Sequence, residues 1–300
     1  MNQENPPKKF HTVWKLFLSD FHTTELSLSI ALFLFGTVFC YYAGYKVDIF
    51  LVAKGLLVIL FFLVGMELLN LIFTDDHSFE TILVETYGVM DYRLIFYILA
   101  AVSIGVGTVI TVFQIREKIA LILAGTILLL IFFYTIKPFR FIYSGYGELL
   151  HAFLVGFLIP GFGYSIMAGS RIPLTLVYLC LPLFFIILAH LYLKSNRTLP
   201  SDIEKYRTTA AMRFGSVVTL RVVVYLIVFS YILVLLLGVD RLPWRFVLRW
   251  YFSIPVGVYL IWLVNQVLAG EKGNWTSIRF LSTSLVLLNV ALLISSMLFL

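Results

Sequence analysis

Two polar segments follow long apolar runs in this chain, and both carry residues that could bind a charged ligand. The first holds six of the sixteen acidic residues, which are Glu67, Asp75, Asp76, Glu80, Glu85 and Asp91. The second, residues 194–213, mixes acids with bases. Carboxylate and amide oxygens suit Mg²⁺, which is often bound together with the phosphates of a substrate. The pattern therefore predicts a site for a cation and for the anion that the cation holds.

In the first segment, three polar side chains would share one face of a helix. Glu67, Asn70 and Thr74 are spaced by three and four residues. Glu67 and Asn70 lie within the apolar run, where an acid costs about 2.5–3.5 kcal/mol on insertion scales. An ordinary solvated acidic loop would not need polar groups there. We therefore predict a metal site in this segment, with the ligands Asn70, Asp75, Asp76 and Glu80.

In the second segment, Asp202 stands among basic residues, in the stretch SNRTLPSDIEKYR. A positively charged loop at a membrane surface would need only the bases, so the acid is the informative residue. Acid and base in one short loop suit a diphosphate bridged by a metal, because cations bind phosphate oxygens and stabilise a departing anion. We predict Asp202 as a metal ligand, Asp75, Asp76 and Asp202 as the catalytic residues, and three diphosphate ligands: Arg197, Lys205 and Arg207.

A third polar region, YTIKPFRFIYSGYGELLH, spans residues 134–151. Lys137 and Arg140 follow an apolar run, and two glycines suit a tight turn. Glu148 begins the next apolar run, where an acid favours the positive end of a helix dipole. Two interpretations stay open on these residues: a short hairpin with a helix-capping acid, or part of a binding site.

The elements that must position these side chains are membrane helices. Hydrophobic residues make up 61% of the 300 residues and charged residues only 13%, a balance unlike that of soluble domains. A membrane span needs about 20 mostly apolar residues, and a backbone in lipid must close its own hydrogen bonds, which favours helices. We expect nine spans, near residues 25–45, 49–74, 91–113, 118–137, 145–168, 172–193, 214–237, 244–268 and 275–299.

We therefore expect an all-α integral membrane protein with nine transmembrane helices around a central cavity. Residues 1–24 would form a cytoplasmic N-terminal segment and residues 25–300 the nine-helix domain. Lys and Arg are more numerous on the side of the N-terminus, which places that side in the cytoplasm. We expect a multi-pass protein of a bacterial plasma membrane, in contact with membrane lipid. The net charge of +6 follows from this topology and does not indicate nucleic-acid binding.

The third polar region resembles the UbiA superfamily of intramembrane prenyltransferases, and is most similar to the 1,4-dihydroxy-2-naphthoate (menaquinone-pathway) branch. That branch carries the pattern Y-T-x-x-P-x-x-x-x-Y-x-G-x-G-E between two helices. The chain matches this pattern at Tyr134, Thr135, Pro138, Tyr143, Gly145, Gly147 and Glu148. The expected nine-helix layout, with two acidic segments on one side, agrees with the resemblance over nearly the whole chain.

The resemblance also gives the two acidic segments a meaning, because members of the superfamily bind Mg²⁺ and a prenyl diphosphate with two Asp-rich motifs. The first motif reads N-D-x-x-D, and here Asn70 matches while Leu and Thr stand at the two aspartate positions. The second reads R-D-x-x-x-D, in which Arg197 and Asp202 match and Thr198 replaces the first aspartate. The chain thus keeps part of each motif.

The function that the resemblance implies is Mg²⁺-dependent transfer of an isoprenyl group from a prenyl diphosphate to an aromatic acceptor, as in quinone biosynthesis. Lys137, Arg140 and Tyr143 would bind and orient the acceptor. Two alternatives stay open. One is a UbiA-type terpene cyclase, which acts on the same diphosphate without an acceptor. The other is a catalytically degenerate homologue that binds or transports lipid.

Overall fold

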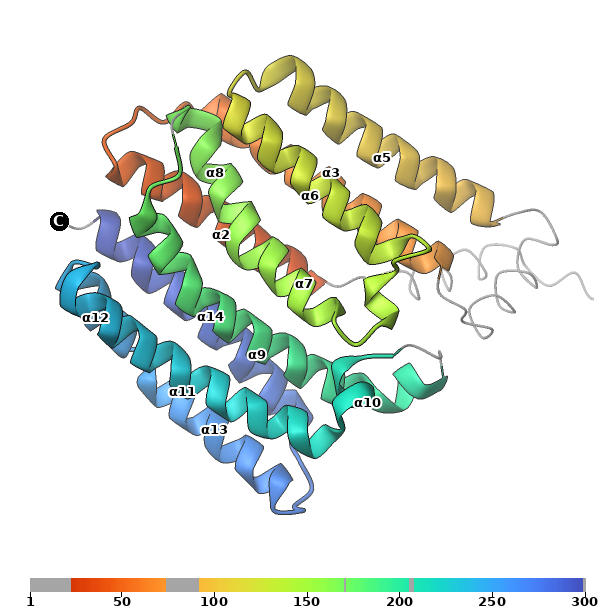
Figure 1. The fold of residues 1–300 in the computed structure, drawn as a ribbon, viewed down its shortest axis with the longest axis vertical. Coiled ribbons are helices and arrows are strands. Elements are labelled where there is room, and N and C mark those ends of the chain that lie inside the picture. The colour runs from red at the N-terminus through yellow and green to blue at the C-terminus, as the bar shows by residue number, and fades with distance from the viewer. Residues whose placement is uncertain (1–22, 74–91, 170, 205–207, 299–300) are drawn as a thin grey trace, which may run out of the picture.

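The computed structural model describes residues 23–73, 92–169, 171–204 and 208–298, and these residues form a bundle of helices without a strand (Figure 1). Within this part of the chain, eight helices are long and apolar enough to cross a membrane, and a bent pair of shorter helices supplies a ninth span. The expected all-helical membrane fold is therefore confirmed. Only residues 23 and 24 of the expected N-terminal segment are described, so its separate character stays a prediction.

The structure describes twelve α-helices along the chain. They are α2 (Thr23–Tyr42), α3 (Ile49–Phe73), α5 (Tyr92–Gln114), α6 (Lys118–Thr135), α7 (Gly147–Phe153), α8 (Ile159–Ala168), α9 (Leu174–Glu204), α10 (Ala210–Phe214), α11 (Ser216–Asp240), α12 (Trp244–Tyr251), α13 (Ile254–Leu268) and α14 (Trp275–Leu298). A π-helical stretch, Leu154–Leu158, joins α7 to α8 as one span. The bent pair is α12 and α13, which meet at 45°.

The centre of the bundle consists of α2, the α7–α8 span and α9. Within their most apolar windows, 56%, 78% and 61% of the residues are buried, against 22% for α5 and 28% for α11. Figure 1 shows α5 along one outer side of the bundle and α13 along the other. The exposed residues of α5 include Leu94, Ile98 and Val109, as expected for a surface that faces lipid.

Close packing of α2 against α8 depends on glycines. A Cβ atom on Gly36 would lie 2.0 Å from the carbonyl oxygen of Pro160, and one on Gly163 would lie 2.4 Å from that of Phe33. Glycine allows two helix backbones to approach closely, and van der Waals packing of this kind drives helix association in lipid. These contacts hold α2 and α8 together in the centre of the bundle.

Helix α9 is longer than expected. We expected the sixth span to end near residue 193 with a loop after it, and this is wrong: the helix continues through Glu204. Its polar side chains bond to carbonyls of the preceding turn, as Asn196 Nδ2 does to the oxygen of Tyr192 at 2.8 Å. Because the segment is helical, Lys194, Thr198 and Asp202 fall on one face, one turn apart.

Candidate functional site

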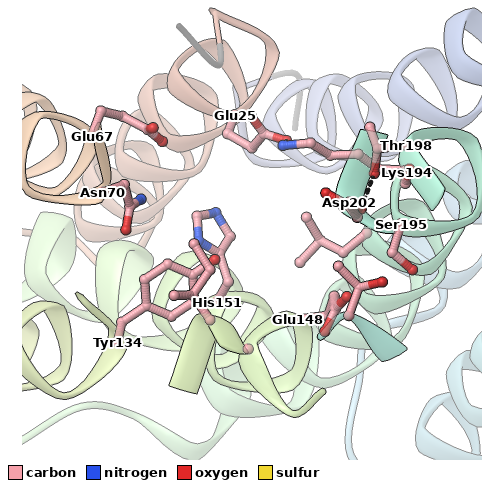
Figure 2. Close-up of a pocket in the computed structure, with 14 residues that line it drawn as sticks. Glu25, Glu67, Asn70, Tyr134, Glu148, His151, Lys194, Ser195, Thr198 and Asp202 are labelled. Atoms are coloured by element: carbon pink, nitrogen blue, oxygen red, sulfur yellow. Dashed lines mark hydrogen bonds and ion pairs between the residues drawn. The ribbon is translucent and has the colours of Figure 1, made fainter. Parts of the chain in front are cut away.

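A cavity lies at one end of the bundle, where α2, α3, α7 and α9 meet (Figure 2). Its volume, including its open mouth, is about 610 Å³. Both hydrocarbon and polar side chains contribute to its wall, so it offers surfaces for an apolar and a charged part of one ligand. The lining residues are Glu25, Glu67, Asn70, Tyr134, Ile142, Gly147, Glu148, His151, Leu191, Lys194, Ser195, Thr198, Asp202 and Thr209.

Helices α3 and α9 contribute opposite walls of the cavity. Figure 2 shows Glu67 and Asn70 on one side, and Lys194, Thr198 and Asp202 across the space from them. The structure therefore brings Asn70 and Asp202, one predicted residue from each polar segment, to the same cavity. Five predicted residues of these segments lie outside the described part of the chain, and they are Asp75, Asp76, Glu80, Lys205 and Arg207.

Asp202 is held in place by its own helix. The residue is 4% exposed, and its Oδ2 atom accepts a hydrogen bond from Thr198 Oγ1 at 2.6 Å. A carboxylate can accept about four hydrogen bonds or metal contacts, so this single bond leaves it able to bind a ligand. The threonine that stands at an aspartate position of the family motif thus orients the aspartate that remains.

Glu25 and Lys194 form an ion pair in the wall of the cavity. Lys194 Nζ lies 2.5 Å from Glu25 Oε1, and the two side chains are 24% and 8% exposed. The pair joins α2 to α9. Glu25 is not among the residues predicted from the sequence, although an acid in the first turn of an apolar helix is the kind of costly residue that indicates a site.

The connection between α6 and α7 meets the segment before α10 at the edge of the cavity. Glu148 Oε1 accepts a hydrogen bond from the backbone N–H of Ala210 at 3.0 Å, and the N–H of Gly145 donates to the oxygen of Thr208 at 2.9 Å. Gly145 has φ +74, a conformation that favours glycine. Glu148 therefore bonds to the first residue of α10 and not to its own helix, and it also lines the cavity.

Two rings from this region complete the wall. His151 and Tyr134 both line the cavity, and their ring centroids are 5.9 Å apart. Both side chains are buried. Neither was predicted as a site residue, since nothing in the sequence shows that the two side chains face the same space as Asp202.

Four predicted ligands do not line the cavity. Lys137 is exposed on the connection between α6 and α7. The Arg140 guanidinium lies over the ring of Tyr143, 3.7 Å from its centroid, and Ile142 between them is the residue that reaches the cavity. Arg197 is half-buried on α9, on a different face from Asp202. The roles predicted for these residues stay predictions.

The donor set at the cavity fits a magnesium ion that arrives with its anionic ligand. Within the described part of the chain, no three His, Cys, Asp or Glu side chains are grouped closely enough to hold a metal ion by themselves. Mg²⁺ typically uses one or two carboxylates and fills its remaining positions with water and substrate phosphates. Asp202 and the amide of Asn70 offer oxygen ligands of these types from two walls of the cavity.

Comparison with known proteins finds one matching family. Residues 91–290, two thirds of the chain, match the UbiA prenyltransferase family. None of the curated protein sequences matches the chain.

Solved structures share the fold at low sequence identity. A structure of digeranylgeranylglyceryl phosphate synthase has a TM-score of 0.65 and 18% identity, with 98% of this chain and 100% of that chain covered. A UbiA homologue from Archaeoglobus fulgidus bound to GPP and Mg²⁺ has a TM-score of 0.64 and 14% identity, with coverages of 90% and 98%. A structure of a UbiA homologue from Archaeoglobus fulgidus bound to DMAPP and Mg²⁺ has a TM-score of 0.63 and 14% identity, with 90% of this chain and 98% of that chain covered.

Proposed function

This chain belongs to the UbiA prenyltransferase family, and from that premise we propose that it transfers an isoprenyl group from a prenyl diphosphate to an aromatic acceptor, as in the menaquinone branch of quinone biosynthesis. The observation that carries the proposal is the convergence of Asn70 on α3 and Asp202 on α9 at one cavity. Oxygen ligands on facing walls suit a metal–diphosphate complex. Structural neighbours bound to GPP or DMAPP with Mg²⁺ support the same substrate class.

The diphosphate would occupy the polar wall of the cavity. Asn70 and Asp202 would hold Mg²⁺, and the full ligand set would also include Asp75, Asp76 and Glu80. Mg²⁺ bound with the substrate would neutralise negative charge and make the diphosphate a better leaving group. Arg197, Lys205 and Arg207 would bind diphosphate oxygens, and the isoprenyl chain would lie against apolar wall residues such as Leu191 and Ile142.

The reaction would proceed through an allylic cation. The C–O bond to the diphosphate breaks, and both electrons leave with the diphosphate. An aromatic carbon of the acceptor then forms a C–C bond with the allylic carbon, and the ring loses a proton. The Tyr134 ring would stabilise the cation through its π face. The His151 imidazole, in the same wall, would accept the proton.

The acceptor would enter beside the connection between α6 and α7. Lys137, Arg140 and Tyr143 flank Ile142, which reaches the cavity, and their charges suit an acceptor that carries a carboxylate. We also propose that this end of the bundle faces the cytoplasm, because Lys and Arg are enriched in the connections on its side. The substrates would then approach from the inner leaflet and the cytoplasm.

The test is pyrophosphate release by purified protein with Mg²⁺ and geranyl, farnesyl or geranylgeranyl diphosphate. We expect release that depends on an aromatic carboxylic acid such as a dihydroxynaphthoate, together with a prenylated aromatic product detected by mass spectrometry. A glyceryl phosphate acceptor serves as the matched comparison, because one structural neighbour is a digeranylgeranylglyceryl phosphate synthase. Release with the glyceryl phosphate and not with the aromatic acid would overturn the proposed acceptor.

Two further outcomes would support the alternatives. Pyrophosphate release that needs no acceptor, with a hydrocarbon or alcohol product, would identify a terpene cyclase. No release, together with no stabilisation of the protein by prenyl diphosphate in a thermal unfolding assay, would leave a homologue that binds or transports lipid. The thermal assay matters because it separates a protein that binds the substrate without turnover from one that does not bind it.

A further inference from the structure

One face of α9 carries a base, a hydroxyl and an acid along the wall of the cavity. Lys194, Thr198 and Asp202 lie one turn apart, and all three line the space. Among the described residues that line the cavity, Lys194 is the one with a permanent positive charge. Lys194 and Asp202 carry opposite charges, and the carboxylates of Glu25, Glu67 and Glu148 also line the cavity. An anion therefore needs a cation in this space, and Lys194 is the side chain that supplies one.

The Lys194 ammonium is oriented and still able to bind a ligand. Glu25 Oε1 engages it at 2.5 Å. An ammonium has three N–H donors, so one carboxylate contact leaves donors for other oxygens, and the side chain keeps 24% of its surface exposed. Figure 2 shows the ammonium beside Glu25 at the rim of the same space that Asp202 faces.

Stability alone gives a weak reason for this pair. The desolvation of two buried charges offsets much of their attraction, and hydrophobic side chains of similar size often stabilise a protein as well. A second observation indicates a polar ligand at the same place. Thr209 is 5% exposed and lines the cavity, and its Oγ1 atom has no hydrogen-bond partner among the described residues.

We propose that Lys194 binds a diphosphate oxygen directly, with Glu25 as its positioning residue, and that its charge replaces part of the charge that metal ions would supply. The inference rests on the proposed function, since it needs a diphosphate in the cavity. The chemistry follows from the composition of the face. Thr198 cannot hold a metal as a carboxylate can, so the face offers one carboxylate for a metal and one ammonium for the anion itself.

The experiment measures binding to the intact, purified protein by calorimetry, with three probes: geranyl diphosphate, inorganic pyrophosphate and geraniol. Each is titrated into wild-type protein and Lys194→Met, with Mg²⁺ and with EDTA. We expect Lys194→Met to lower the affinity for geranyl diphosphate and for pyrophosphate about ten- to a hundredfold, as for loss of a charged hydrogen bond. The affinity for geraniol should not change. In EDTA, wild-type protein should keep measurable affinity for geranyl diphosphate and Lys194→Met should not.

Two variants serve as controls. Lys194→Arg retains the charge and should bind geranyl diphosphate within about threefold of the wild type, because a guanidinium also binds phosphate oxygens. Lys272→Met removes the same charge from an exposed residue that does not line the cavity, and its affinities should equal those of the wild type. If Lys194→Met does not fold, Lys194→Gln replaces it, because an amide can still donate a hydrogen bond to Glu25.

The outcomes separate the two proposals. If wild-type protein binds geranyl diphosphate and Lys194→Met binds it equally well, the role of Lys194 is overturned and the proposed function stands. If Lys194→Met lowers the affinity for geraniol as strongly as the affinity for the diphosphates, the residue supports only the shape of the cavity, which also overturns the inference. If wild-type protein binds neither diphosphate under any condition, the proposed function fails and the inference fails with it.

Discussion

Two groups of polar residues lie in different parts of this bundle, one near α10 and one beside α12, and Figure 1 shows these two helices toward opposite ends of the bundle. The first is the cavity, with Asn70, Lys194 and Asp202 in its walls. The second is a network between α11, α13 and α14 that is centred on Ser253. The Ser253 hydroxyl contacts Tyr231 Oη at 2.8 Å and donates to Asn289 Oδ1 at 2.9 Å.

The groups differ in what their polar atoms face. Ser253 and Asn289 are fully buried, and the Asn289 amide also donates to the oxygen of Leu285 at 2.8 Å. The network closes on itself and holds the bend between α12 and α13. In the cavity, polar groups on facing helices point at one another across open space. A polar residue inside a membrane protein therefore indicates a site only where it faces space that a ligand can fill.

The largest expected effect comes from Asp202→Asn. The amide keeps the shape of the side chain and still accepts the Thr198 hydrogen bond, but it removes the charge that holds a metal. We expect turnover to fall by about a hundredfold or more, since loss of even outer-shell partners of a metal costs about 10- to 100-fold. Pyrophosphate release measures this, and an unchanged midpoint of thermal unfolding shows that the fold is intact. Unchanged turnover would remove Asp202 from the site.

A smaller effect is expected from Asn70→Leu, on the facing wall. Leucine fills a similar volume and removes the amide oxygen. We expect the Mg²⁺ concentration for half-maximal activity to rise about tenfold, with a smaller change in turnover at saturating Mg²⁺, because an amide oxygen is a weaker ligand than a carboxylate. A variant whose Mg²⁺ dependence matched that of the wild type would show that α3 does not contribute to the metal site through this residue.

A substitution in the Ser253 network should change the stability of the protein and not its activity. Asn289→Leu removes one acceptor of the Ser253 hydroxyl, which also bonds to the oxygen of Trp250 at 2.7 Å. We expect the free energy of unfolding to fall by about 1 kcal/mol, in the range measured for hydrogen bonds between membrane helices. That corresponds to a fall of about 2 °C in the unfolding midpoint for a chain of this size. The KM for prenyl diphosphate should not change. A changed KM at unchanged stability would contradict the separation of the two groups.

The smallest effect is expected from Glu148→Gln. Its carboxylate already accepts the N–H of Ala210, and the side-chain oxygen of glutamine can do the same. Turnover should stay within about threefold of the wild type, since the hydrogen bond is kept and only its charge assistance is lost. Glu148 and Asp202 both line the cavity, so this variant is the matched control for Asp202→Asn. An equal loss in the two variants would assign Glu148 to the reacting groups.

Much of the fold could be predicted because the signals for it are local. The expected spans 49–74 and 118–137 agree closely with α3 (Ile49–Phe73) and α6 (Lys118–Thr135). The length and apolarity of each run determine whether it crosses the membrane. The end of α9 could not be predicted in the same way, because its last turns are polar and the apolar run ends before them. These turns are helical nonetheless, and their side chains face the cavity or bond to the preceding turn.

The sequence by itself determined the membrane helices, the family and the two polar segments, because hydrocarbon requires apolar helices and makes each polar residue within them costly. Only the tertiary structure decided which polar side chains share one space. Glu25 and Lys194 are 169 residues apart in the chain, and Asn70 and Asp202 lie on facing helices. No local pattern encodes such pairs, because they depend on how α2, α3 and α9 pack around the cavity.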